Sequence, residues 1–114
     1  MSISSCKAKL VAIFATKNIT LNEIGDSIID EQGYFLYYAG AKRIAVGRLE
    51  REFVILVSEY AQKTTEDRVD AVEAVLLEIS LAPEEIGHTA TSPLYITDDG
   101  LFMYRVSLKV IDEG

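Results

Sequence analysis

The side chains best suited to chemistry in this sequence are one cysteine, one histidine and two neighbouring aspartates. Cys6 and His88 are the only residues of their types, so a cysteine nucleophile would have to take His88 as its base. Asp98 and Asp99 have the spacing of paired carboxylates, which serve acid–base catalysis or bind a divalent cation. Each of these uses requires partners elsewhere in the chain.

Structural roles explain these four residues more simply. Cys6 lies on the apolar side of a predicted N-terminal helix, where a small buried side chain is ordinary. His88 lies in a predicted loop, and Asp98 and Asp99 precede Gly100, which is typical of a tight turn. No further oxygen ligand follows at the spacing of a calcium loop. We therefore expect no enzyme activity, no catalytic residue, no metal site and no cofactor.

A basic segment in an acidic chain is the feature that these roles leave unexplained. The chain has 114 residues, with 11 Lys and Arg against 18 Asp and Glu, and a net charge of −7. Residues 42–51 hold four basic side chains and one acidic (net +3), so the other residues hold seven basic and seventeen acidic (net −10). The basic residues of the segment are Lys42, Arg43, Arg48 and Arg51.

This charge distribution favours a protein partner. Gly40 and Gly47 do not form a phosphate loop, because Arg48 follows where a Gly-Lys-Ser/Thr ending would be needed. The acidic remainder opposes general nucleic-acid binding, since phosphate contacts would be made against the protein's own field. Separated positive and negative regions instead steer copies of a protein, or an acidic partner, into a fixed register. We expect no specific nucleic-acid partner.

The hydropathy of the chain predicts one soluble domain over residues 1–114. Nearly half of the residues are apolar and only two are proline, as in a folded domain. No apolar run near the start has the length of a signal peptide or a membrane span, so we expect no membrane partner and synthesis in the cytoplasm. The single cysteine cannot form a disulfide within the chain.

The N-terminal third permits two interpretations. Apolar residues recur at helical spacing over residues 3–16, and Ser2, Ser4 or Ser5 can cap that helix. Residues 7–14 also alternate as a strand would, but their Ala and Lys content favours the helix. Residues 20–31 predict a second, short helix, because Thr20 and Glu23 make a capping-box pair.

The middle of the chain predicts two strands and a helix. Residues 34–39 and 52–60 read as strands, and the second is apolar on both faces, which predicts a central position in a sheet. The basic segment joins them as a ribbon that projects beyond the sheet. Thr64 is the predicted cap of the following helix, with Glu66 and Asp67 in its first turn and Pro83 beyond its end. Its predicted buried stripe is Val69, Val72, Val75, Leu76 and Ile79.

The C-terminal part predicts a second, shorter hairpin. Residues 94–97 form a short strand, residues 98–100 the turn, and residues 101–111 a long strand with one core face and one accessible face. The predicted fold is therefore α+β: an antiparallel sheet of about four strands, with two helices packed on one face and the order α-β-β-α-β-β. Its first hairpin is long and projecting.

This layout resembles a family, the tail-terminator and minor-tail proteins of Mu-like and lambda-like phages. Four segments carry the resemblance, namely residues 34–38, 51–60, 71–79 and 92–107. The resemblance implies a structural protein that forms a ring, typically a hexamer, docks on the tail tube protein and stops the growth of the tube. It also implies assembly in the host cytoplasm and a final place in the virion tail, whether the chain belongs to a phage, a prophage or a tail-like machine.

A ring requires two different surfaces on each subunit, because head-to-tail contacts join unlike patches. The predicted interface pairs the basic residues Lys42, Arg43, Arg48 and Arg51 with the acidic residues Glu66, Asp70 and Glu73 on the second long helix. Two alternatives remain open. One is a small acidic binding module, such as an immunity or inhibitor protein; the other is a ferredoxin-like ligand-binding domain, which would need a strand over residues 7–14.

Overall fold

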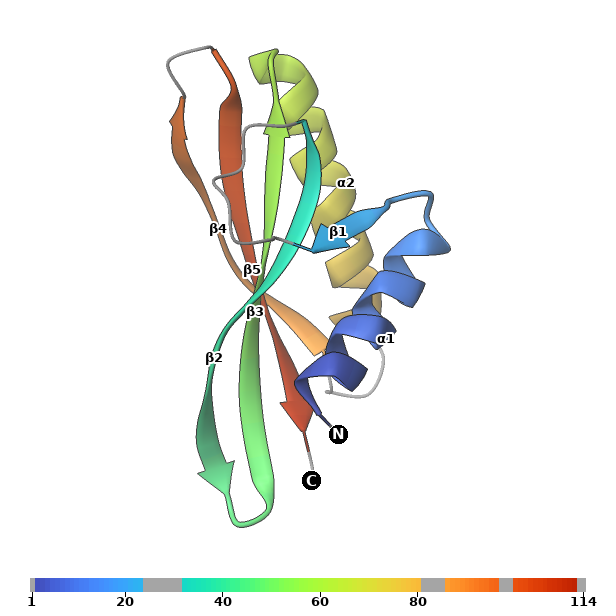
Figure 1. Cartoon of the computed structure of the whole chain (residues 1–114), viewed down its shortest axis with the longest axis vertical. Helices are drawn as coiled ribbons and strands as arrows, with labels where there is room; N and C mark the ends of the chain where they lie inside the picture. Colours follow the sequence, from blue (N-terminus) through green and yellow to red (C-terminus); the bar gives the residue numbers. More distant parts are fainter. Residues whose placement is uncertain (1, 24–31, 81–85, 97–99, 113–114) are drawn as a thin grey trace.

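The computed structural model describes residues 2–23, 32–80, 86–96 and 100–112, and the α+β class is confirmed (Figure 1). A helix and a short strand precede a long hairpin, a second helix follows, and a second hairpin ends the described chain. In order, the elements are α1 (Ile3–Ala15), β1 (Leu21–Glu23), β2 (Gly33–Ala45), β3 (Arg48–Glu59), α2 (Gln62–Ser80), β4 (Ile86–Ile96) and β5 (Phe102–Asp112).

The sheet has five strands in the order β1-β2-β3-β5-β4. It is mixed, because β1 runs parallel to β2 while the other neighbours are antiparallel. The predicted four-stranded antiparallel sheet and its order are therefore wrong. The difference is β1, which lies where a short helix over residues 20–31 was predicted. Leu21 is buried in the core and Asn22 donates a hydrogen bond to the Tyr34 carbonyl, so pairing with β2 overrides the local capping pattern. Residues 24–31 lie outside the described part.

The first helix forms as predicted. Ser2 is its N-cap and accepts a hydrogen bond from the Ser5 backbone, and Cys6, Leu10 and Phe14 lie fully buried along one side. Asn18 then adopts a left-handed conformation (φ 61°), which ends the helix as asparagine commonly does. The alternative of a strand over residues 7–14 is therefore wrong. The order of helices and strands that a ferredoxin-like fold would need is wrong with it.

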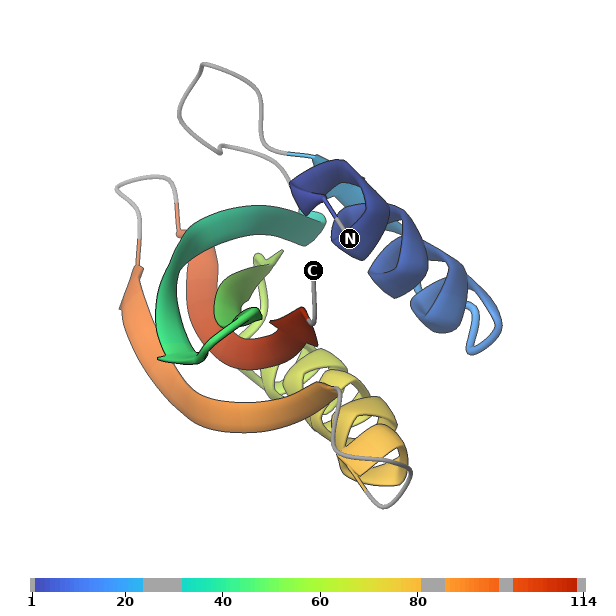
Figure 2. The same ribbon diagram turned by 90° about the horizontal axis from the view of Figure 1, so that it is seen from below.

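Both helices pack on the same face of the sheet (Figure 2). The core between the helices and the sheet contains Leu36 of β2, alternate residues of β3 and β5, and the apolar stripe of α2. The central position predicted for residues 52–60 is confirmed, since β3 lies between β2 and β5 and is buried from Phe53 to Glu59. The predicted stripe of α2 is confirmed too: Val69, Val72, Val75 and Leu76 are buried, and Ile79 packs against them.

The start of α2 differs from the prediction. The helix begins at Gln62, because the Thr65 backbone N–H already donates to the Ala61 carbonyl at 3.0 Å. Thr64 is therefore inside the helix rather than its cap, and Glu66 lies beyond the first turn, where the helix dipole has less effect on it. Pro83 lies outside the described residues.

The second hairpin is longer than predicted. Its first strand covers Ile86–Ile96, with bulges between His88 and Ala90 and between Pro93 and Tyr95. The bulges break the alternation that would have indicated a strand. His88 consequently lies in a strand and not in a loop. Gly100 has φ +90°, which fits the predicted turn, while Asp98 and Asp99 lie outside the described residues.

The face of the sheet opposite the helices is not uniformly accessible, contrary to prediction. Met103 and Ser107 of β5 are buried on that face. Strong twisting curls the strands into arcs (Figure 2), so part of this face closes on itself. A second apolar cluster results, formed by Phe35, Val54, Leu56, Leu101 and Met103, with Tyr37 against it.

The β2–β3 hairpin extends beyond both helices and forms one end of the molecule (Figure 1). The molecule is elongated, with extents of 46 × 29 × 21 Å. The end of β4, the start of β5 and the start of α2 lie at the opposite end (Figure 1). The turn end of the basic segment thus lies beyond the helices (Figure 1).

Candidate functional site

The tip of the β2–β3 hairpin carries exposed aliphatic and basic side chains. Gly47 takes φ +75° in the turn, a conformation that favours glycine. Ile44 and Val46 are exposed, and 86% of Val46 is accessible to solvent. Arg43 and Arg48 flank the turn and are exposed as well. Arginine is enriched at protein interfaces, and the two exposed aliphatic side chains add apolar area beside the arginines.

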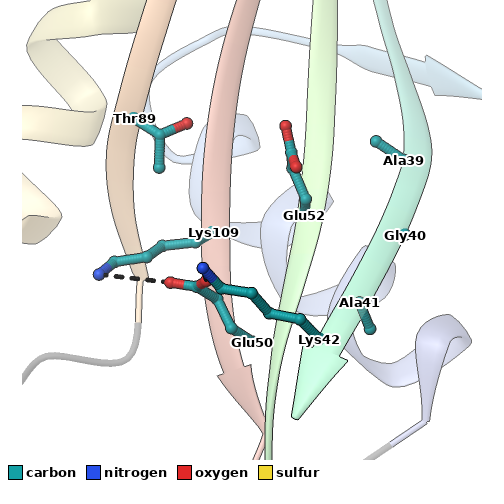
Figure 3. Close-up of a pocket in the computed structure, with 8 residues that line it drawn as sticks. All are labelled: Ala39, Gly40, Ala41, Lys42, Glu50, Glu52, Thr89 and Lys109. Atoms are coloured by element: carbon teal, nitrogen blue, oxygen red, sulfur yellow. Dashed lines mark ion pairs between the residues drawn. The ribbon is translucent and has the colours of Figure 1, made fainter. Parts of the chain in front are cut away.

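Lys42 belongs to a different surface, on the face of the sheet opposite the helices (Figure 3). Its Nζ lies 3.2 Å from Glu50 Oε2, and Lys109 Nζ lies 3.6 Å from Glu50 Oε1. These side chains border a hollow of about 520 Å³, together with Glu52, Thr89 and the small residues 39–41. Two lysines and two glutamates balance one another there. The hollow therefore carries no net charge that would select an anion or a cation.

Arg51 is part of the core of the hairpin base. Its Nε donates to Asp112 Oδ2 at 2.9 Å and its Nη1 to the Tyr38 hydroxyl at 3.1 Å. Only 14% of the Arg51 side chain and 2% of the Asp112 side chain are exposed. The hydrogen bond to Asp112 raises the pKa of Arg51, so the guanidinium stays charged. Arg51 is consequently held within its own chain.

The predicted basic cluster thus divides into three parts. Lys42 pairs with Glu50, Arg51 pairs with Asp112, and Arg43 and Arg48 lie exposed on either side of the turn. Those two arginines line a hollow of about 360 Å³, and residues 45, 47, 49, 51 and 112 line the rest of it. Arg43 and Arg48 therefore form the candidate basic surface. We use the name hairpin tip for these two arginines together with Ile44 and Val46.

The predicted acidic surface divides similarly. Glu66 and Asp70 are exposed on α2. Glu73 is half-buried and accepts a 2.7 Å hydrogen bond from the Thr91 hydroxyl. His88 Nε2 lies 2.7 Å from Thr91 Oγ1. Because the Thr91 proton points to Glu73, His88 Nε2 donates to Thr91 and cannot act as its base. Glu73 thus links α2 to β4 and is not a free interface residue.

Replacing Thr91 tests this structural link. Thr91→Val removes the hydroxyl that connects Glu73 and His88, and we expect it to lower the free energy of unfolding by about 1 kcal/mol. Urea denaturation measures the change. Thr89→Val is the matched control, because Thr89 is exposed on the same strand. Equal stability of the two variants would contradict the structural role of the link.

An apolar hollow at the opposite end of the molecule was missed from the sequence. Pro93, Leu94, Ile96, Phe102, Met103, Tyr104 and Gln62 line it, and its volume is about 230 Å³. Ile96 is 59% exposed at its rim. The sequence offers one signal for it, the apolar pair Leu94 and Ile96 on a strand edge beside Pro93. The surface becomes recognisable only when β5 and the start of α2 are placed next to it.

Cys6 is fully buried, as the ordinary structural role predicts. Burial raises the pKa of its thiol above the usual 9.0, and the negative charge of Asp112 raises it further. The thiol stays protonated near neutral pH and is shielded from reagents. Cys6 is therefore a core residue.

The raised pKa of Cys6 predicts a pH-dependent stability. Above pH 9.0 the unfolded thiol loses its proton before the folded one does, so the unfolded state gains stability as the pH rises. We expect the wild type to lose up to about 1.4 kcal/mol per pH unit relative to Cys6→Ala until the folded thiol also ionises. Urea unfolding of both proteins from pH 8 to 10.5 measures this difference. A constant difference would show that burial does not shift the thiol.

No family model matches the chain, and no curated protein matches it. Within the described ranges, no helix has both the length and the apolar character needed to cross a membrane. Among the same residues, no group of three or more His, Cys, Asp and Glu side chains could hold a metal ion.

Proposed function

We propose that this chain is a structural tail protein of the tail-terminator type, which assembles into a ring and caps a tail tube. The observation that carries the proposal is the β2–β3 hairpin, which projects from one end of the molecule with Arg43, Arg48 and exposed Val46 at its tip. Such an extension contributes little to its own core. It gains stability when another protein covers it.

The charges of the molecule support contacts between copies. The hairpin tip is positive, whereas Glu66, Asp67 and Asp70 make the exposed side of α2 negative. The two surfaces are unlike, so contacts between them join the front of one copy to the back of the next. Contacts of this kind close into a ring when the rotation per subunit divides a full turn. Six copies are the number that the family resemblance suggests.

The proposal predicts a tail tube gene in the same gene cluster, and the product of that gene is used to test tube capping. Tubes assembled from that protein are imaged by negative-stain electron microscopy with and without an excess of this chain. We expect shorter tubes with additional density at one end. An unchanged length distribution and bare ends would contradict the capping role, even if the chain forms rings by itself.

A second candidate is an inhibitor or immunity protein that binds a basic target. The exposed carboxylates Glu66, Asp67 and Asp70 favour it, because they form a compact acidic surface on one helix. This function predicts a stoichiometric complex with a different protein and a monomer in its absence. Analytical ultracentrifugation of the chain alone separates the two candidates, since only the tail protein forms rings without a partner.

A further inference from the structure

The two ends of the molecule carry complementary surfaces that one copy cannot bring together. Val46 is exposed at the hairpin tip, and the apolar hollow is lined by Gln62 and by residues of β4 and β5. The elements that line the hollow, namely the end of β4, the start of β5 and the start of α2, lie at the other end of the long axis from the hairpin (Figure 1). The longest extent of the molecule is 46 Å, so the tip cannot reach the hollow of its own chain. Contact between these surfaces requires a second copy.

We propose that the hairpin tip of one copy docks into the apolar hollow of a second copy, with Val46 as the inserted side chain. This inference rests on the proposed function, in that it names the contact from which the ring is built. Removing Val46 from water would supply a hydrophobic contribution that the charged residues lack.

The size and lining of the hollow fit a side chain better than a metabolite. Its volume of about 230 Å³ lies below the ~300–1,000 Å³ of small-molecule sites. Leu94, Ile96 and Phe102 give it an apolar lining, to which Met103 and Tyr104 also contribute. One or two aliphatic side chains suit a site of this kind. Ile44 lies two residues before Val46 and is exposed beside it.

The charges around the two surfaces identify the occupant as a second copy. Arg43 and Arg48 flank the tip, while Glu66 and Asp70 follow Gln62 on α2. Asp70 is eight residues beyond Gln62, about 12 Å along the helix. The first turn of α2 contains no acidic residue and includes Lys63, and the acidic residues begin at Glu66, one turn beyond Gln62. Insertion of the tip beside Gln62 would therefore bring the arginines near Glu66 and Asp70. The complementary halves are both present on this chain, so no other partner is required.

Disulfide trapping tests the contact. We combine Val46→Cys and Leu94→Cys in one chain; Cys6 is buried and does not compete. Mild oxidation is expected to give a ladder of covalent multimers on non-reducing gels. The control combines Val46→Cys with Leu77→Cys, because Leu77 is 61% exposed on α2 and does not line the hollow. Equal ladders from both proteins, or no ladder from the first, would overturn the proposal.

A second pair of variants measures the contribution of Val46. Val46→Asp is expected to raise the concentration at half-assembly about tenfold or more, since it places a carboxylate in an apolar site. Leu77→Asp is the control and is expected to leave assembly unchanged. Val46→Asp assembling like the wild type would exclude the docking contact while leaving the ring itself intact. A wild type that neither assembles nor cross-links would exclude both the contact and the ring.

Discussion

Reversing the charges of Arg43 and Arg48 together, as R43E/R48E, is expected to raise the concentration at half-assembly about 100-fold or more. Each arginine lost from the hairpin tip removes an attraction to the acidic side of α2, and each glutamate adds a repulsion. Like charges brought together in an interface cost several kcal/mol, and about 1.4 kcal/mol corresponds to tenfold in affinity. Light scattering against protein concentration measures the change.

The fold of this double variant should remain intact. Arg43 and Arg48 are exposed, and surface substitutions usually change the free energy of unfolding by less than about 0.5 kcal/mol. Urea denaturation therefore serves as its control. A variant that assembles like the wild type, at low salt as well as high, would remove the hairpin tip from the interface.

A complementary variant makes the same test sharper. Glu66→Lys and Asp70→Lys reverse the charge of the partner surface, so this protein alone should also assemble poorly. Mixing it with R43E/R48E makes both contacts between unlike variants attractive, so mixed rings in which the two variants alternate should form. Charge reversal on both sides restores pairing only if these surfaces face each other. Absence of mixed assemblies would show that the acidic contact lies elsewhere.

Replacing Arg51 is expected to lower the free energy of unfolding, whereas replacing Arg43 is expected to leave it nearly unchanged, although both residues belong to the same basic segment. Arg51→Met should lower the free energy of unfolding by about 3 kcal/mol, because it removes the ion-pair partner of the buried Asp112. It also removes the hydrogen bond to Tyr38. Thermal and urea denaturation measure the loss.

Arg43→Met is the matched control, since it makes the same substitution at an exposed position of the same hairpin. It should change stability by less than about 0.5 kcal/mol. Asp112→Asn and the double variant complete a thermodynamic cycle that isolates the coupling between Arg51 and Asp112. Equal losses from Arg51→Met and Arg43→Met would contradict the structural assignment of Arg51.

Long regular segments were predictable from the sequence. Cys6, Leu10 and Phe14 recur every four residues, and the Ala and Lys content of the segment favoured a helix over a strand, so α1 could be predicted. An apolar run on both faces placed β3 at the centre of the sheet. Each of these patterns lies within one continuous segment, so the burial of that segment can be predicted without knowing which other segment it packs against.

Features that depend on distant pairing were not predictable. The three residues of β1 form a strand only because β2 offers its edge to Leu21. The bulges of β4 hide its alternation, so it was predicted as a short strand. The basic cluster looked uniform, yet Arg51 pairs with a carboxylate 61 residues away. Sheet register decides such pairs, and a single sequence does not reveal it.

The apolar hollow could not be predicted from the sequence for the same reason. Its wall comes from β4 and β5, and Gln62 comes from the start of α2. No segment of the sequence carries the hollow alone. The hairpin tip, by contrast, is contiguous in sequence, which explains why only one half of the proposed contact could be recognised from composition and charge.

The central claim, that this chain assembles into a ring by itself, is tested most directly by native mass spectrometry. Samples at several protein concentrations are sprayed from low and moderate salt, because screening weakens contacts between exposed charges. One closed species of about 76 kDa, six times the 12.6 kDa chain, is the expected result, and its abundance should fall as salt rises. A 12.6 kDa monomer under every condition, with and without the tail tube protein, would contradict the claim.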